Sequence, residues 1–365
     1  MSNQEVTNVQ AAEVVLTGAE LAETVAFFVE RLGFEIAMVA PADDPAVVVV
    51  RGHGLRVRLE RGRSGSPAVL RLHCRDPLAM AHGATVLTAP GGTRIELVAA
   101  DPPLVVPPLV PALVVSAASS PSASAQGRAG MRYRDLLPDR QGGRFIASLI
   151  QIPEAGPVPD YVHYHAVRFQ MIYCVKGWVR VVYEDQGPPF VLREGDAVLQ
   201  PPRIRHRVLE SSAGLEVLEV ACPAWHETFA EHEMALPTPT VRAEREFGGQ
   251  RFVRHEATRA IWRPWRDVAF EVSDLGIAGA THGLAGAQMV RCVRAGARCR
   301  AESPPDGELQ FRFVLRGTAV FSRLAGPDVQ LMTGTALTVP AGMQHELREC
   351  SSDLEWLEVT LPAAG

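Results

Sequence analysis

The 365-residue sequence lacks the features that mark several classes of protein. It has no apolar run near the roughly 20 residues that a membrane-spanning helix needs, so we expect no contact with a membrane. Its start, MSNQEVTNVQ, has neither the basic nor the apolar region of a signal peptide. It also has no cluster of lysine or arginine, and its net charge is −5. Nucleic-acid binding is therefore not expected, because phosphate binding requires concentrated positive charge.

Cysteine is scarce and scattered. The six cysteines form no CxxC pair, which is the spacing of many metal and redox sites. This distribution predicts a reduced, cytoplasmic protein in which most thiols are buried as small hydrophobic groups.

What the sequence does contain is a repeat with an offset close to 140 residues. FQMIYCVKG, ending at Gly177, matches LQFRFVLRG, ending at Gly317, and LEVLEVACPA from Leu215 matches LEWLEVTLPA from Leu354. Each copy consists of short runs rich in valine, leucine and isoleucine, separated by glycine and proline, a pattern typical of antiparallel barrels. We therefore predict a mainly β protein with tandem barrels at residues 131–240 and 241–365.

The N-terminal part follows a different pattern. Residues 19–33 have helical periodicity, and Gly33 suits the position just after a helix. An apolar strand precedes this helix and several strands follow it, which predicts a small α+β domain of βαβββ order over residues 1–100. Residues 101–130 are rich in proline, alanine and serine and are predicted to be a linker, flexible from Ala117 onward. The apolar stretch at 109–115 is expected to pack on a neighbour.

The strongest chemical signal is the motif HYH at residues 163–165. Alternate residues of a strand face the same side, so His163 and His165 can point into one barrel and share a metal ion. Gln170 begins the next predicted strand, and His206 follows a glycine and a proline turn. The four side chains together predict a site for one divalent metal ion. Zinc, iron, nickel, copper or manganese would suit it, and the sequence does not choose among them.

The spacing of these residues resembles the two motifs of the cupin superfamily, which read here GPVPDYVHYHAVRFQMIYCVKG and GDAVLQPPRIRH. The resemblance implies small antiparallel barrels, of the double-stranded β-helix or jelly-roll type, with the metal inside. Cupins usually have glutamate at the position of Gln170. A neutral amide leaves the full positive charge on the ion, which favours Lewis-acid chemistry.

Three further residues are predicted to serve the site. Glu219 lies in the last strand of the first barrel, and a carboxylate in an apolar barrel suits proton transfer. The set resembles a cupin family that helps to linearise unsaturated uronates, in which such a carboxylate lies next to the metal. Tyr161 and Arg168 are predicted to bind substrate, the first by facing the interior two residues before His163 and the second by holding a substrate carboxylate.

The second barrel is predicted to have lost its metal site. The offset places Ser303 and Pro305 where the histidine pair should be, although Gln310 and His345 survive. One histidine and one glutamine rarely hold a metal alone. We therefore predict a structural partner or closing wall.

The segment AELAETVAFFVERLGF and the later TRIELV resemble the vicinal-oxygen-chelate superfamily of glyoxalase and extradiol dioxygenase relatives. Glu96 occupies a frequent ligand position of that superfamily, but the other ligands have no counterpart, so a degenerate domain is predicted. Its role stays open between binding a small ligand, forming a homodimer and covering the barrel mouth.

Three functions are compatible with the sequence. The first is a metal-dependent isomerase, lyase or hydrolase acting on a small carboxylate-bearing or polyhydroxylated substrate. The second is an Fe(II)-type dioxygenase. The third is a small-molecule sensor without catalysis. The Gln170 amide favours the first function.

Overall fold

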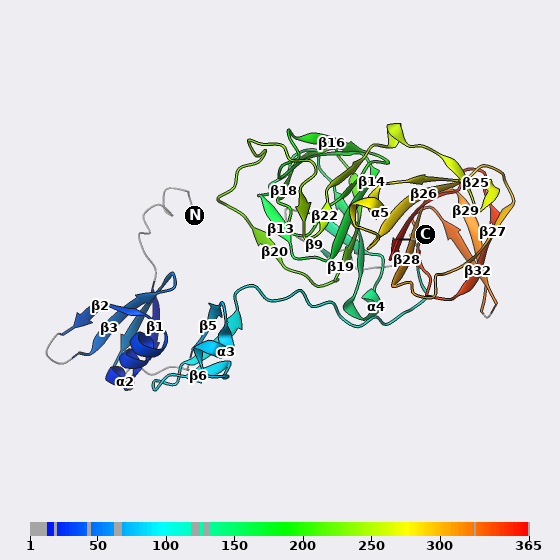
Figure 1. Cartoon of the computed structure of the whole chain (residues 1–365). Coiled ribbons are helices and arrows are strands. Elements are labelled where there is room, and N and C mark those ends of the chain that lie inside the picture. Colours follow the sequence, from blue (N-terminus) through cyan, green and yellow to red (C-terminus); the bar gives the residue numbers. More distant parts are fainter. Residues whose placement is uncertain are drawn as a thin grey trace. The chain divides into compact units, whose positions relative to one another are not determined.

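The computed structural model describes residues 13–17, 20–41, 45–61, 68–117, 125–126, 131–324 and 326–363. The chain divides into two compact units, Met1–Pro103 and Leu104–Gly365 (Figure 1). Within the described ranges, no helix has both the length and the apolar character needed to cross a membrane. All six cysteines carry free thiols.

The N-terminal unit has the predicted βαβββ order. Its first sheet has the strand order β1-β4-β3-β2, with β1 parallel to β4. Phe28 and Leu32 of the helical segment are buried against this sheet, and Gly33 ends the helix with a φ of 72°. A second sheet has the order β5-β7-β6. The elements are β1 (Val14–Thr17), α2 (Leu21–Ala26), η1 (Phe27–Arg31), β2 (Glu35–Ala40), β3 (Val47–Gly52), β4 (Leu55–Glu60), β5 (Val69–Cys74), α3 (Pro77–Met80), β6 (Val86–Thr88) and β7 (Arg94–Ala99).

Glu96 of β7 lies between two arginines. Its carboxylate is 2.9 Å from Arg71 and 3.2 Å from Arg94. Hydrogen bonds from these guanidinium groups lower the pKa of Glu96. The carboxylate is thus engaged in ion pairs, as expected for a structural role, and the vicinal-oxygen-chelate resemblance stays a prediction.

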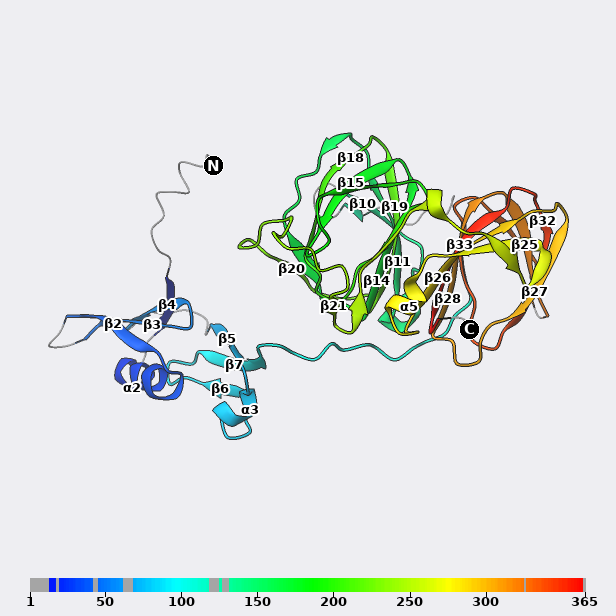
Figure 2. The same cartoon turned by 45° about the horizontal axis from the view of Figure 1, so that its top comes forward.

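The first barrel consists of two facing sheets. One has the strand order β23-β17-β14-β19-β11-β10-β9, and the other has β16-β15-β18-β13-β20, with β12 paired to β18. Figure 2 shows the ring of strands from its open end. The elements are β9 (Ala125–Gln126), β10 (Arg132–Asp135), α4 (Arg140–Gly143), β11 (Ile146–Ile152), β12 (Gly156–Pro157), β13 (His163–His165), β14 (Phe169–Lys176), β15 (Trp178–Tyr183), β16 (Phe190–Arg193), β17 (Ala197–Leu199), β18 (His206–Ser211), β19 (Leu215–Cys222), β20 (Thr228–Ala230), β21 (Glu246–Phe247), β22 (Gln250–Arg251) and β23 (Val253–His255).

The second barrel repeats this arrangement, as the sequence repeat predicts. Its sheets have the orders β24-β25-β26-β33-β28-β31-β8 and β27-β32-β29-β30. The central run β17-β14-β19-β11 of the first barrel therefore corresponds to β31-β28-β33-β26. The elements are η3 (Ala257–Arg259), β24 (Arg263–Trp265), β25 (Asp267–Asp274), α5 (Ile277–Ala280), β26 (Gly286–Cys292), β27 (Ala297–Glu302), β28 (Leu309–Arg316), β29 (Thr318–Arg323), β30 (Val329–Met332), β31 (Ala336–Thr338), β32 (Gln344–Cys350) and β33 (Glu355–Leu361), together with β8 (Val114–Ser116).

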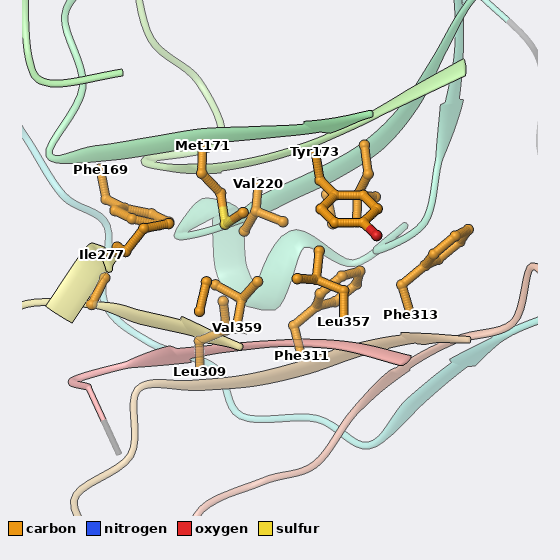
Figure 3. Packing of buried hydrophobic residues seen from close by; sticks show 14 of the residues in the cluster. Phe169, Met171, Tyr173, Val220, Ile277, Leu309, Phe311, Phe313, Leu357 and Val359 are labelled. Atoms are coloured by element: carbon orange, nitrogen blue, oxygen red, sulfur yellow. The ribbon is translucent and has the colours of Figure 1, made fainter. Parts of the chain in front are cut away.

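The two barrels pack through the outer faces of their corresponding sheets. Figure 3 shows side chains of β14 and β19 meeting those of β28 and β33. On β14 this contact uses Phe169, Met171 and Tyr173, so the residues between them face the interior of the first barrel. The interface therefore fixes the register that points Gln170 inward.

The segment that precedes the barrels is part of their unit from Leu104 onward. Val106 and Leu109 pack against the interface cluster, and β8 pairs with β31 as the outermost strand of a sheet in the second barrel. Residues 104–116 of the predicted linker are thus built into the fold. The stretch expected to be flexible beyond Ala117 lies, apart from β9, outside the described residues.

Candidate metal centre and its cavity

Three histidines converge inside the first barrel. His163 and His165 share a face of β13 because they are two residues apart, and β13 pairs with β18 so that His163 lies opposite His206. One ligand atom of each histidine lies within 4.8 Å of those of the other two. Two nitrogens bound to one ion at about 2.1 Å lie at most about 4.2 Å apart, so a small closing movement of the rings would let all three bind the same ion.

The ring nitrogens are oriented by neighbouring groups. The Nδ1 atom of His163 lies 2.8 Å from the carbonyl oxygen of Tyr161, and Nδ1 of His206 lies 3.0 Å from that of Ile204. A carbonyl oxygen only accepts, so each Nδ1 donates and the lone pair of the neutral ring is on Nε2. Nδ1 of His165 lies 2.9 Å from the hydroxyl oxygen of Thr228. Such partners fix the orientation of metal-binding histidines, and this donor set fits a divalent ion.

Gln170 lies beside the histidines and is 2% exposed. Its Nε2 donates a hydrogen bond of 2.6 Å to Oε1 of Glu219 on β19. That bond fixes the amide, and its oxygen is the atom left to ligate an ion. The sequence pattern predicted both residues but not their contact, which joins two strands through residues 49 positions apart.

The histidines, Gln170 and Glu219 line one cavity of about 470 Å³. This lies within the size range of about 300–1,000 Å³ that is usual for small-molecule sites. Most of the remaining lining is aliphatic. Tyr183 also lines the cavity, stacks on His206 and accepts a hydrogen bond of 2.8 Å from Gln200. Burial raises the pKa of Tyr183, so its hydroxyl stays protonated.

Tyr161 and Arg168, both predicted to bind substrate, do not line this cavity. Tyr161 precedes the first residue of β13, so strand alternation does not extend to it, and it is 39% exposed. Arg168 binds both carboxylate oxygens of Glu308 in the second barrel, at 2.7 and 3.1 Å. This ion pair links the two barrels. The predicted contact between Arg168 and a substrate therefore has no structural support.

His226 is a cavity residue that no sequence motif predicted. Its Nδ1 lies 2.9 Å from the carbonyl oxygen of Pro223, which leaves Nε2 as the acceptor, and its ring centroid is 5.4 Å from that of His165. It lies between β19 and β20, outside the repeated sequence, so no spacing pointed to it. Thr228, the partner of His165, also comes from this segment.

The second barrel has no histidine pair, but the counterparts differ from those that the offset predicted. Ala301 pairs with His345 as His163 pairs with His206. The backbone bond from Gly342 to Ser303 repeats that from Arg203 to His165. Ala301 and Ser303, not Ser303 and Pro305, therefore hold the corresponding positions. The offset shifts because the connection to the next strand is longer in the second barrel. Among the described residues, a group of three metal-ligating side chains occurs only in the first barrel.

In the second barrel, a guanidinium group lies between the counterparts of His206 and Glu219, where the first barrel has its candidate metal site. Arg312, the counterpart of Ile172, binds Glu358 at 2.6 Å and lies 3.0 Å from Nε2 of His345. Burial and the adjacent Arg312 lower the pKa of His345 to about 4, so the ring is neutral at neutral pH. The pKa of Glu358 is lowered because Arg312 outweighs the effect of burial. The second barrel thus supplies its own internal cation.

Both barrels are similar to known proteins. The cupin domain matches residues 149–221 and 290–360, one stretch in each barrel. A deletion mutant of Bacillus subtilis oxalate decarboxylase OxdC is 15% identical, with a TM-score of 0.51 over 67% of this chain and 76% of that chain. A serine-to-alanine mutant of the same enzyme is 14% identical, with a TM-score of 0.50 over 66% and 75%. At these identities the likeness concerns the fold. Comparison with curated proteins gave no match.

Proposed function

We propose that this protein, whose two barrels are cupin domains, is a metal-dependent enzyme with its active site in the first barrel. The observation that carries the proposal is the convergence of His163, His165 and His206 in a cavity that also holds Gln170 and Glu219. A divalent ion bound there would polarise a substrate oxygen or lower the pKa of bound water.

In this proposal, some residues of the cavity bind the ion and others transfer protons. The three imidazoles would hold the ion through Nε2, and the Gln170 amide would complete the set through its oxygen. Glu219 is bonded to Gln170 through Oε1, which leaves Oε2 to accept a proton from the substrate. His226 is a second proton acceptor in the same cavity. A small oxygenated substrate turned over by isomerisation, elimination or hydrolysis fits this arrangement.

The first experiment measures metal content in protein purified without a metal-binding tag. We expect about one equivalent of a divalent metal in the wild type, its loss in His163→Ala and its retention in His282→Ala. His282 is a matched control because it is exposed in the second barrel. Absence of metal from the wild type, even after reconstitution, would exclude the proposed centre.

The class of chemistry is decided by a second measurement on the metal-loaded enzyme. Turnover of carbonyl and hydroxyl compounds under strict anaerobiosis is expected for Lewis-acid chemistry. Oxygen uptake coupled to substrate loss would instead identify a dioxygenase. Tight binding of a metabolite without conversion would identify a sensor.

A further inference from the structure

We infer that the substrate of the first barrel is a largely hydrocarbon molecule that carries its oxygen function at one end. The inference rests on the proposed metal site and specifies the substrate class of that site. It differs from the polyhydroxylated substrate that the sequence predicted as one alternative, and the reasons lie in the cavity wall.

Strand register makes the wall change from polar to aliphatic with distance from the histidines. On β18, His206 is followed on the same face by Val208. On β19, Glu219 is preceded on the same face by Val217 and then Leu215. β11, β14, β15 and β16 add further isoleucine, valine and leucine side chains. Apart from the phenol of Tyr133, which lies opposite Ile150, a ligand that filled this space would therefore meet polar groups at one end and aliphatic groups along its length.

The composition of the wall disfavours a ligand that carries charges or several hydroxyl groups along its length. Among the described residues that line the cavity, none is an arginine or a lysine. The one carboxylate, Glu219, would offset part of the positive charge of the proposed ion, so a ligand meets its only cation at the histidine end. Sugar hydroxyls placed along the aliphatic wall would lose hydrogen bonds to water without replacement, at a cost of about 1–3 kcal/mol each.

The second barrel indicates that this space is specific to the first barrel and not a consequence of the fold. The position of Val217 is occupied there by Trp356, and that of Val181 by Phe321, both buried in the core of the second barrel. Ile172 is replaced by Arg312, whose guanidinium binds Glu358. The same strands thus fill their interior in one copy and line a cavity in the other. Small side chains in the first copy are what a ligand cavity requires.

The test uses the full-length, zinc-loaded protein and the series of straight-chain hydroxamic acids from acetohydroxamate to octanohydroxamate. All members present the same chelating group, so differences in affinity report on the wall alone. We expect calorimetric affinity to rise about fourfold for each added methylene until the chain fills the cavity, the value for complete burial of a methylene. Affinity independent of chain length, or oxalate bound more tightly than octanohydroxamate, would overturn the inference.

Variants that copy the second barrel give an independent test. Val217→Trp and Val181→Phe should each lower the affinity for octanohydroxamate at least about tenfold and leave that for acetohydroxamate unchanged. Val181→Phe is the milder change, in case the indole does not fit. Val241→Thr, at a residue 62% exposed and outside the cavity, serves as the control. Equal affinities in all three variants and the wild type would contradict an apolar binding wall.

Metal content, measured on each sample, separates failure of this inference from failure of the proposed function. If the protein holds zinc but its affinity for hydroxamates does not depend on chain length, the proposed metal centre stands and the inference of an apolar substrate fails. A protein that holds no zinc would refute the metal centre. In that case binding of straight-chain alcohols, which need no metal, still tests the wall, and affinity that does not rise with chain length would overturn it.

Discussion

At the scale of single residues, the two barrels place a glutamate at the same interior position and compensate it differently. Glu219 accepts a hydrogen bond from the Gln170 amide, next to three histidines that can hold a cation. Glu358 is 1% exposed and pairs with Arg312. A buried carboxylate requires a partner because desolvation of an isolated charge is costly. The guanidinium of the second barrel therefore takes the electrostatic role that we propose for the metal in the first.

Removal of the Arg312 charge should destabilise the second barrel strongly. We expect Arg312→Met to lower the free energy of unfolding by about 3–5 kcal/mol, because Glu358 would remain buried without its ion-pair partner, with the Gln288 amide as its remaining hydrogen-bond donor. Denaturant unfolding monitored by circular dichroism measures this loss. Arg316→Met breaks a pair with Glu194 in which both side chains are more than half exposed, and should cost less than about 1 kcal/mol. Similar losses in the two variants would contradict the proposed importance of burial.

His345 should make stability depend on pH. Its pKa is lowered to about 4 in the folded protein, chiefly by burial and next by Arg312, whereas an unfolded histidine titrates near 6.5. The unfolded chain therefore binds the proton more readily, and stability is lost as the pH falls from about 6.5 towards 4. Titration of Glu358, whose pKa is also lowered, acts in the same direction.

The histidine contribution can be isolated by comparing the wild type with His345→Gln, which keeps an acceptor for Arg312. We expect the difference in urea midpoint between the two proteins to change over this pH interval and to be constant above it. A constant difference across the whole range would show that His345 keeps an ordinary pKa.

At the scale of elements, the side chains of β14 alternate between the interface of the two barrels and the cavity of the first barrel. Phe169, Met171 and Tyr173 form the interface between the barrels, whereas Gln170 and Ile172 face the cavity. A slip of one residue would exchange these two sets of side chains. β28 has the same division, with Phe311 and Phe313 at the interface (Figure 3). The packing of the barrels and the geometry of the site are thus set by the same strand register.

Because β14 and β28 correspond, the internal cation of the second barrel can be transferred to the first. Ile172 lies opposite Glu219 as Arg312 lies opposite Glu358. We expect Ile172→Arg to abolish metal binding while the protein remains folded, since the guanidinium would pair with Glu219 and reach His206. Metal analysis and thermal unfolding measure both properties. Ile172→Met, which adds length without charge, should retain the metal, and loss of metal from both variants would count against displacement by charge.

At the scale of the whole molecule, the two barrels of the C-terminal unit are tied together by charge and by the segment that precedes them. Glu308 of the second barrel binds Arg144 and Arg168 of the first. Hydrogen bonds from these arginines, that of Arg168 foremost, lower the pKa of Glu308. Leu109 packs on the interface and β8 extends a sheet of the second barrel. Residues 104–116 therefore belong to the barrel unit in structure, although their composition is that of a linker.

Two truncations should show whether residues 104–116 belong to the barrel unit or act as a linker. Removal of residues 1–103 should leave the melting temperature of the barrel unit unchanged, because it takes away one compact unit and no strand of the other. Removal of residues 1–117 should lower it by at least about 5 °C, because the β8 ladder and its apolar contacts are lost. Differential scanning calorimetry of the two proteins gives the comparison. Equal melting temperatures would mean that β8 contributes nothing to the barrels.

The sequence by itself determined the elements that depend on local pattern. Its repeat predicted two barrels of the same topology, and its alternation placed His163 and His165 on one face. The spacing to Gln170 and His206 identified the remaining members of the candidate site. The placement of these side chains was predictable because a strand has a side-chain period of two, so the face of each residue is encoded in the sequence. Their role as metal ligands stays a prediction.

Only the tertiary structure decided which side chains meet across strands and domains. Arg168 was predicted at the substrate but binds Glu308, because the second barrel covers its side of the first. Alternation failed at Tyr161, which precedes the strand, and His226 reached the cavity from a connecting segment. The aliphatic cavity wall and the Arg312–Glu358 ion pair could not be predicted from the sequence, because they depend on the volume and charge of side chains from several strands. Strand periodicity fixes the face of a residue, and only packing fixes what it faces.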